Sequence, residues 1–177
     1  MTVIRSPLRS PLRSPLFSPL QGKWGGSADS LIVALHIDSD IDTVGERDDI
    51  AAMPLWFATQ DVFDIVGLTA SAPDSSIVEY QNCIDAYAID RPTLLRKVPT
   101  PSRLKTAVEL TALKVQGPTV DAPAVGYRVS GDASYAAAHA CAQLMIANAL
   151  AYGDPDSDDP RDKLWIVVQG GYVNLAQ

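Results

Sequence analysis

The feature that most constrains the fold is a continuous, largely apolar segment from Leu31 to Ile37, which is followed at once by acidic residues. Polar and apolar side chains do not alternate in it, which is typical of a strand buried on both faces in a helix-covered parallel sheet. A second segment of this kind, Leu164 to Val168, lies near the other end of the sequence. Nothing in the chain reaches the length of a membrane span. The two segments predict an α/β domain built on a parallel sheet.

Further elements are predicted between these two strands. Strands that alternate with helices form right-handed βαβ units, and ligands bind beyond the carboxyl ends of such strands. Pro54 falls inside the first predicted helix, which should therefore start late or be kinked. The predicted elements are a strand from Asp64 to Thr69 and helices from Asp48 or Asp49 to about Thr59, from Ser75 or Ser76 to about Ala88, from Ser102 to Leu113, and from Tyr135 to Leu150.

The N-terminal stretch is a repeat in which Arg-Ser-Pro-Leu occurs three times and Phe-Ser-Pro-Leu once. Proline at every fourth position excludes a helix and a central strand, so residues 1–28 should form an extended arm with a glycine-rich joint. Residues 29–177 then form the body. The arm is either a disordered linker or an anchor, and we favour an anchor that inserts leucines into pockets of other protein subunits. These leucines are Leu8, Leu12, Leu16 and Leu20.

The net charge of −7 conceals an uneven distribution. Four of the 14 basic residues and none of the 21 acidic residues precede Asp29. The body is therefore strongly acidic, which argues against nucleic-acid binding and is compatible with a divalent cation. Cys83 and Cys141 both lie in apolar, helix-like surroundings and are predicted to be buried free thiols.

Five aspartates occur within twelve residues directly after the first strand: Asp38, Asp40, Asp42, Asp48 and Asp49. Such a cluster is stable only when it is solvated or neutralised by a cation. One interpretation is a solvated acidic loop that caps the following helix. The other is a site for a hard cation such as Ca²⁺, which prefers six to eight oxygen ligands.

The order of these acids resembles that in nucleoside hydrolases of the inosine/uridine-preferring type. Their signature is an Asp-x-Asp pattern after the first strand, then an Asp-Asp pair. Residues 63–69 look like the second strand of that family, and residues 84–87 with 91–94 look like its next helix and loop. The segment 164–177, which reads LWIVVQGGYVNLAQ, is similar to the strand and glycine-rich turn that reach the same metal. The resemblance implies an incomplete nucleoside-hydrolase-like domain, namely the N-terminal half of that fold.

The resemblance also implies roles for individual residues. An aspartate would activate a water molecule for attack on the anomeric carbon of a ribosyl group, through a transition state of oxocarbenium character. Asp40 matches the general base, which also touches the metal, and Asp49 matches a bidentate metal ligand. Asp38 and Asp48 match their acidic neighbours, Val173 matches a residue whose backbone carbonyl binds calcium, and Asn174 matches the rim of the substrate site.

The sequence departs from the family pattern in three respects. The loop between Asp40 and Asp48 is longer than in the shortest family members, and Pro54 enters the helix behind the metal. The second half of the family fold, with another aspartate ligand and the leaving-group histidine, would lie beyond Gln177. His36 and His139 are predicted to be packed or surface residues rather than catalytic acids.

Two main functions remain open. The repeat resembles proline-rich repeats at the N-termini of phage tail and fibre proteins, which favours a structural or receptor-binding component of a virion that takes a glycan or nucleoside ligand. The alternative is an active calcium-dependent nucleoside N-ribohydrolase or related glycosidase, cytoplasmic and dependent on residues beyond 177. A remnant without a role is a third reading.

Overall fold

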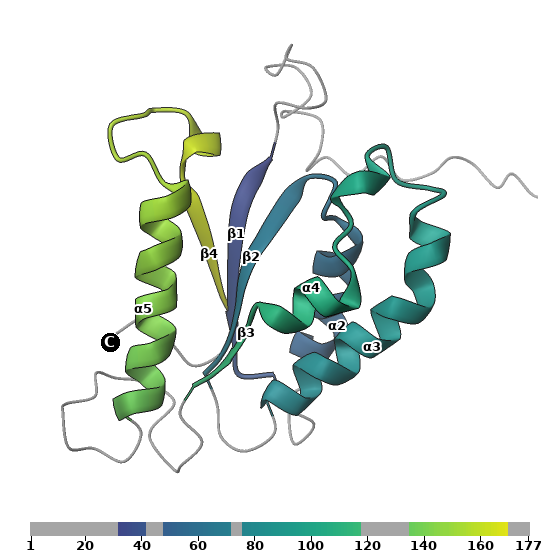
Figure 1. The fold of residues 1–177 in the computed structure, drawn as a ribbon, viewed down its shortest axis with the longest axis horizontal. Coiled ribbons are helices and arrows are strands. Elements are labelled where there is room, and N and C mark those ends of the chain that lie inside the picture. Colours follow the sequence, from purple (N-terminus) through teal and green to yellow (C-terminus); the bar gives the residue numbers. More distant parts are fainter. Residues whose placement is uncertain (1–31, 42–47, 72–75, 118–134, 170–177) are drawn as a thin grey trace, which may run out of the picture. The chain divides into compact units, whose positions relative to one another are not determined.

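The computed structural model describes residues 32–41, 48–71, 76–117 and 135–169. At its centre lies a parallel sheet of four strands in the order β3-β2-β1-β4 (Figure 1). The strands are β1 (Val33–Ser39), β2 (Phe63–Ala70), β3 (Lys114–Gln116) and β4 (Leu164–Gln169). The predicted α/β fold with a parallel sheet is confirmed.

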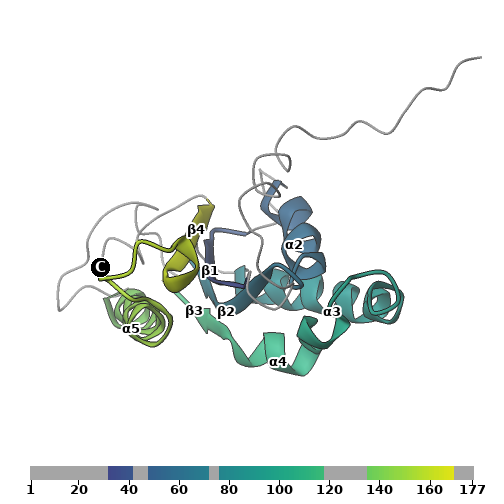
Figure 2. The ribbon, with the colours of Figure 1, turned by 90° about the horizontal axis from the view of Figure 1, so that it is seen from above.

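Helices lie on both sides of this sheet, as Figure 2 shows from above. On one side are α2 (Asp48–Ala58), α3 (Ser76–Leu94) and α4 (Ala107–Ala112), and on the other side is α5 (Tyr135–Tyr152). Two short 3₁₀ turns, η2 (Pro101–Arg103) and η3 (Pro160–Asp162), precede α4 and β4.

Successive side chains of β1 pack on opposite sides of the sheet, because the side chains of a strand point in turn to its two faces. Leu35 and Ile37 join the hydrophobic core that includes Phe57 of α2 and Tyr80 of α3. His36, which lies between them in sequence, bonds instead to a side chain of α5. The strand is therefore buried on both faces, as its sequence predicts.

The helix predictions hold with three differences. Helix α2 runs through Pro54 without a break. Helix α3 extends six residues past its predicted end and includes Pro92. The helix predicted from Ser102 to Leu113 is divided, because Pro101 starts a 3₁₀ turn and Thr106 starts α4 with a capping box. The three-residue strand β3 has no counterpart among the predictions, since so short a segment carries no periodicity.

The strand order reverses between β1 and β4. The chain runs from β1 to β2 and β3 in one direction and then returns to place β4 on the far side of β1. In open α/β sheets the crevice beyond the carboxyl ends of two such strands is the usual ligand site. Here the backbone N–H of Asp40 donates to the carbonyl of Gln169 over 2.9 Å, so the residues that leave β1 and β4 lie side by side.

Within the described ranges, no helix has the length and apolar character that crossing a bilayer requires. The predicted arm, residues 1–28, and the predicted domain boundary at residue 29 lie outside the described residues.

Candidate functional site

The carboxyl end of β1 meets the first turn of α2. Ser39 Oγ donates a hydrogen bond of 2.7 Å to Asp49 Oδ2, and the N–H of Ile41 donates to Ser39 Oγ over 3.1 Å. Asp48 and Asp49 occupy the first turn of α2, where negative charge interacts favourably with the helix dipole. The local sequence therefore holds acidic groups at the edge of the sheet where a ligand is expected.

The carboxyl group of Asp40 lies close enough to that of Asp49 to affect its pKa. Burial raises the pKa of Asp49 to about 6, and the bond to Asp40 and the charges of Asp40 and Asp48 act in the same direction, while the bond from Ser39 opposes them. Asp49 is only 8% exposed. The Asp49 carboxyl group therefore keeps its proton up to about pH 6, well above the usual range of an aspartate.

Asp38 is fully buried at the end of β1. Thr69 Oγ1, from the neighbouring strand β2, donates a hydrogen bond of 2.7 Å to Asp38 Oδ1. Tyr80 of α3 donates its hydroxyl hydrogen to the backbone carbonyl of Thr69 over 3.2 Å. The pKa of Tyr80 lies well above its usual range, first because of burial and then because of the negative charge of Asp38.

His36 is a packed residue, as its position inside a strand predicts. Its ring nitrogens lie 3.0 Å from Thr69 Oγ1 and 3.1 Å from Asn148 Nδ2. Burial lowers the pKa of His36 to about 4, so the ring is neutral at physiological pH. His139 is exposed on α5 and stacks on Tyr135, with ring centroids 5.3 Å apart.

The structure thus brings Asp40, Asp48 and Asp49 together where β1 ends and α2 begins, whereas Asp38 lies at the end of β1 with Thr69 of β2 as its partner. Among the described residues, no group of three or more His, Cys, Asp or Glu side chains could hold a metal ion. The other predicted site residues, Val173, Asn174, Leu8, Leu12, Leu16 and Leu20, lie outside the described residues.

The sequence prediction missed several neutral polar residues around these acids. Ser39 lies inside the Asp-Ser-Asp motif, and Thr69 ends the second predicted strand. Their positions at the carboxyl ends of strands could have identified both as candidate site residues. Asn148 lies at i+3 from Met145 on the buried face of an alanine-rich helix, which also contains Cys141. An asparagine on the buried face of this helix could have been predicted to bond to another buried polar group, because buried polar groups need hydrogen-bond partners.

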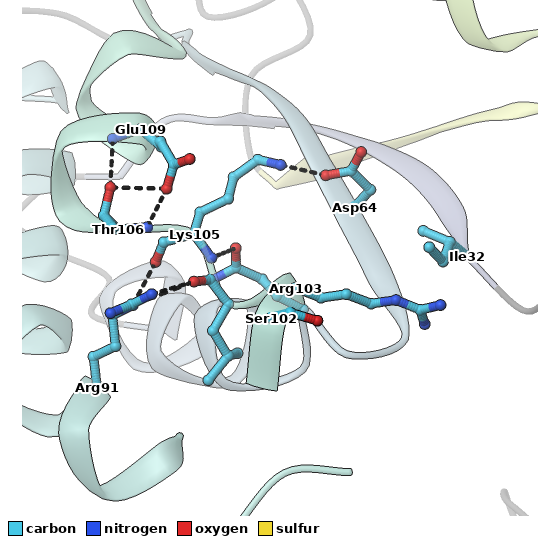
Figure 3. A pocket seen from close by; sticks show the side chains of 10 residues that line it. Ile32, Asp64, Arg91, Ser102, Arg103, Lys105, Thr106 and Glu109 are labelled. Atoms are coloured by element: carbon cyan, nitrogen blue, oxygen red, sulfur yellow. Dashed lines mark hydrogen bonds and ion pairs between the residues drawn. The ribbon is translucent and has the colours of Figure 1, made fainter. Parts of the chain in front are cut away.

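A cavity of about 400 Å³ opens elsewhere, at the amino ends of the strands (Figure 3). Lys105 forms an ion pair with Asp64 near the start of β2, and Arg91 donates to the backbone carbonyls of Leu104 and Lys105. Arg103 donates to the carbonyl of Asp61. These bonds fasten residues 101–106 to the body. Asp64 and Ala70 lie at opposite ends of β2. At about 3.3 Å per residue, the cavity is therefore roughly 20 Å from the acidic groups at the carboxyl end of the sheet.

The two cysteines are free and buried, as predicted. Burial raises the pKa of Cys83 to about 11 and that of Cys141 to about 12. Both thiols are therefore protonated at neutral pH, and neither is suited to nucleophilic chemistry.

Comparison of the chain with protein-family models, with curated proteins and with solved structures gives no match in any of the three. The assignment of a function therefore depends on the geometry at the carboxyl ends of β1 and β4.

Proposed function

We propose that the body is a nucleoside-hydrolase-like domain whose acidic edge binds a calcium-type cation, and that the arm tethers it to a larger assembly of the phage-tail type. The observation that supports the cation site is the contact between the Asp40 and Asp49 carboxyl groups at the reversal of strand order. Two carboxyl groups held together in a partly buried place are an arrangement that a cation stabilises.

The donor chemistry fits such an ion. Carboxylate oxygens are the ligands that calcium prefers, and Ser39 already orients one oxygen of Asp49. A bound cation would displace the proton that Asp49 holds below about pH 6 and would offset the repulsion between the charges of Asp40 and Asp49. The described residues supply a pair of carboxylates, so further oxygens would come from water, from a ligand, or from the backbone carbonyl that we assign to Val173.

In this proposal each acidic residue has a separate task. Asp49 would hold the cation, and Asp40 would contact it and accept a proton from a water molecule that attacks the anomeric carbon while the C–N bond to the departing base breaks. The ligand class is a ribosyl nucleoside or a related glycan. The cation would supply positive charge that makes a nearby water molecule more acidic and orients sugar hydroxyl groups.

The cation site is tested by calcium titration of the full chain. We expect calcium to raise the melting temperature, because a ligand at 100 times its Kd stabilises the folded state by about 2.7 kcal/mol. The Asp49→Ala variant should lose this effect. The control is Asp90→Asn, which alters an exposed aspartate of α3 away from the site and should respond to calcium as the unmodified protein does. A melting temperature of the unmodified protein that is independent of calcium overturns the proposal.

The catalytic alternative is favoured by the same pair, since Asp40 lies beside a carboxyl group whose pKa is raised to about 6. Incubation of the full chain with inosine, uridine and a nitrophenyl riboside, each with and without calcium, tests it. Calcium-dependent release of the base that Asp40→Asn abolishes supports catalysis. Calcium binding without release of the base supports a binding or structural role.

A further inference from the structure

The cavity of about 400 Å³ in Figure 3 lies at the opposite edge of the sheet from Asp40 and Asp49. Sites for small molecules in proteins have volumes of about 300–1,000 Å³, so this cavity is large enough for one. Leu104 and Ile32 contribute apolar surface to it, and its other lining residues are polar or charged. The size and the lining suit a small molecule that has both a charged and an apolar part.

The charge of this cavity differs in sign from that of the rest of the body. Of the 21 acidic residues, two line it, namely Asp64 and Glu109. Of the 14 basic residues, four precede Asp29, and three of the remaining ten line the cavity: Arg91, Arg103 and Lys105. The cavity therefore has an excess of positive charge, although acidic residues outnumber basic ones in the body as a whole. A local field of this sign attracts small anions.

The basic side chains are held in place by bonds to the backbone. Arg91 of α3 donates to the carbonyl oxygen of Leu104 over 2.7 Å from Nη2 and to that of Lys105 over 3.0 Å from Nε. Figure 3 shows that Arg103 and Lys105 extend from this same turn, Lys105 toward Asp64 and Arg103 toward Ile32. Arg91 therefore fixes the turn, and the turn places two further positive charges along the cavity.

Arg103 and Lys105 have the donor chemistry that binds oxygen anions. The ammonium group of Lys105 has three donors, and the ion pair with Asp64 requires one of them. The guanidinium group of Arg103 has five donors in a planar fork, and Nη1 donates to the carbonyl oxygen of Asp61 over 2.9 Å. Charge-assisted hydrogen bonds from such groups are the usual contacts of phosphate and carboxylate groups.

The rim of the cavity already holds one carboxylate in this field. Glu109 Oε2 accepts from the backbone N–H of Thr106 over 2.6 Å and from its hydroxyl group over 2.8 Å. These two bonds lower the pKa of Glu109, and the positive charges of Lys105 and Arg91 lower it further. Since Glu109 is exposed, the positive charge of the cavity extends to its mouth, where a ligand would enter.

We propose that this cavity binds a small organic molecule through an anionic oxygen group, a phosphate or a carboxylate, which Arg103 and Lys105 hold. Ile32 and Leu104 contact the apolar part of the molecule. Asp64 and Glu109 limit the negative charge that the site accepts, because both repel the ligand. The proposal does not depend on the candidate cation site, which lies at the other edge of the sheet.

A purely structural role for these residues would have a different consequence. The bonds of Arg91, Arg103 and Lys105 would then only fasten residues 101–106 to the body, and substitutions would change stability without any effect on ligands. A ligand site predicts saturable binding of anions at the cavity. It also predicts that the affinity falls when a positive charge is removed and rises when a negative charge is removed.

The test uses three variants and one control in the full chain. Arg103→Gln removes a positive charge and should weaken binding. Asp64→Asn removes a negative charge but keeps an acceptor for Lys105, and it should strengthen binding. Glu109→Gln also removes a negative charge, and because glutamine can complete a capping box, it leaves the start of α4 intact. Arg96→Gln makes the same change as Arg103→Gln at an exposed arginine that does not line the cavity, and it is the control.

Binding is measured by nitrogen-15 NMR of the backbone amides, near neutral pH and at constant ionic strength. The two probes are inorganic phosphate and malonate, which carries two carboxylates. We expect saturable shift changes at residues 102–106 of the unmodified protein. The affinity should change by about three- to tenfold in the direction given for each variant, while Arg96→Gln remains near the unmodified value.

The two probes distinguish the possible anionic groups. Saturable binding of phosphate alone, of malonate alone or of both supports the site and identifies which group it accepts. Shift changes that do not saturate, or that are equally large away from the cavity, overturn the proposal. An affinity that Asp64→Asn and Glu109→Gln both leave unchanged also overturns it. These two variants decide the proposal even if Arg103→Gln fails to fold, since damage to the structure would not make binding tighter.

Discussion

Asp49 is a carboxyl group in surroundings that disfavour its charge. Its pKa is about 6 in the folded protein against 3.8 as an ordinary side chain. The folded state therefore binds a proton more tightly than the unfolded state between these values. The stability that this proton contributes is complete below about pH 4 and is lost as the pH rises through 6, by roughly 2–3 kcal/mol at about 1.4 kcal/mol per pKa unit.

The Asp49→Asn variant tests this effect. An asparagine can still accept from Ser39 and can donate to Asp40 without a charge of its own. We expect it to be more stable than the unmodified protein by about 2 kcal/mol at pH 8 in EDTA, with a difference that disappears near pH 4. Urea unfolding across this range measures it. The calcium response should be lost in the same variant.

His36 has the opposite pH dependence, since its lowered pKa adds stability as the pH rises from about 4 to 6.5. The contribution of His36 is the same in the unmodified protein and in Asp49→Asn, so it cancels when their stabilities are compared. Asp90→Asn serves as the matched control, because it makes the same substitution at an exposed aspartate of α3. The assignment is wrong if the stability difference for Asp49→Asn varies no more with pH than that for Asp90→Asn.

Gly67 leaves room for the contact between His36 and Asn148. A Cβ atom there would overlap the ring of His36, so Gly67→Ala should cost about 1–3 kcal/mol of stability. When His36 is also replaced by alanine, the closest overlap is removed and only the 2.9 Å approach to Asn148 Nδ2 remains. We expect the double variant to lose at least about 1 kcal/mol less than the sum of the two single variants. Strict additivity in urea unfolding would contradict this contact.

At the scale of single elements, α2 carries Pro54 in its interior. Proline lacks the N–H that would bond to the carbonyl of residue 50, so the helix gives up one hydrogen bond. Because Pro54 is exposed, no packing depends on its ring. Pro54→Ala should stabilise the protein by about 1–3 kcal/mol, reduced somewhat by the greater freedom of the unfolded chain.

The control for this prediction is Pro101→Ala. Pro101 occupies the first position of η2, where the absent N–H would have had no partner within the turn. Thermal or urea unfolding should show little change for this variant. Equal effects of the two substitutions would mean that the interior position of Pro54 is not what weakens α2.

At the scale of the whole molecule, the arm and the body are predicted to act separately. Deletion of residues 1–20 should leave the melting temperature of the body unchanged, since the leucines of the repeat are expected to contact other subunits. The truncated protein should be absent from the assembly, as judged by size-exclusion chromatography with its partner proteins. Normal incorporation of the truncated form would rule out the anchor.

The sequence by itself determined the layout of the body. Continuous apolar segments of strand length predict buried parallel strands, because only helix-covered sheets bury both faces of a strand. Acidic residues directly after such a strand predict a site at the carboxyl edge, because parallel strands all end at the same edge. Asp38, Asp40 and Asp49 follow from these two rules. The nucleoside-hydrolase relationship and the cation stay predictions.

Only the tertiary structure decided which residues meet. Periodicity indicates that a residue is buried, but it does not say which residue it contacts. The strand order, the register shift at His36 and the contact between Asp40 and Asp49 depend on packing among elements that are distant in sequence. Asn148 reaches His36 because α5 packs across the sheet at that register, and no local pattern in the sequence encodes that pairing.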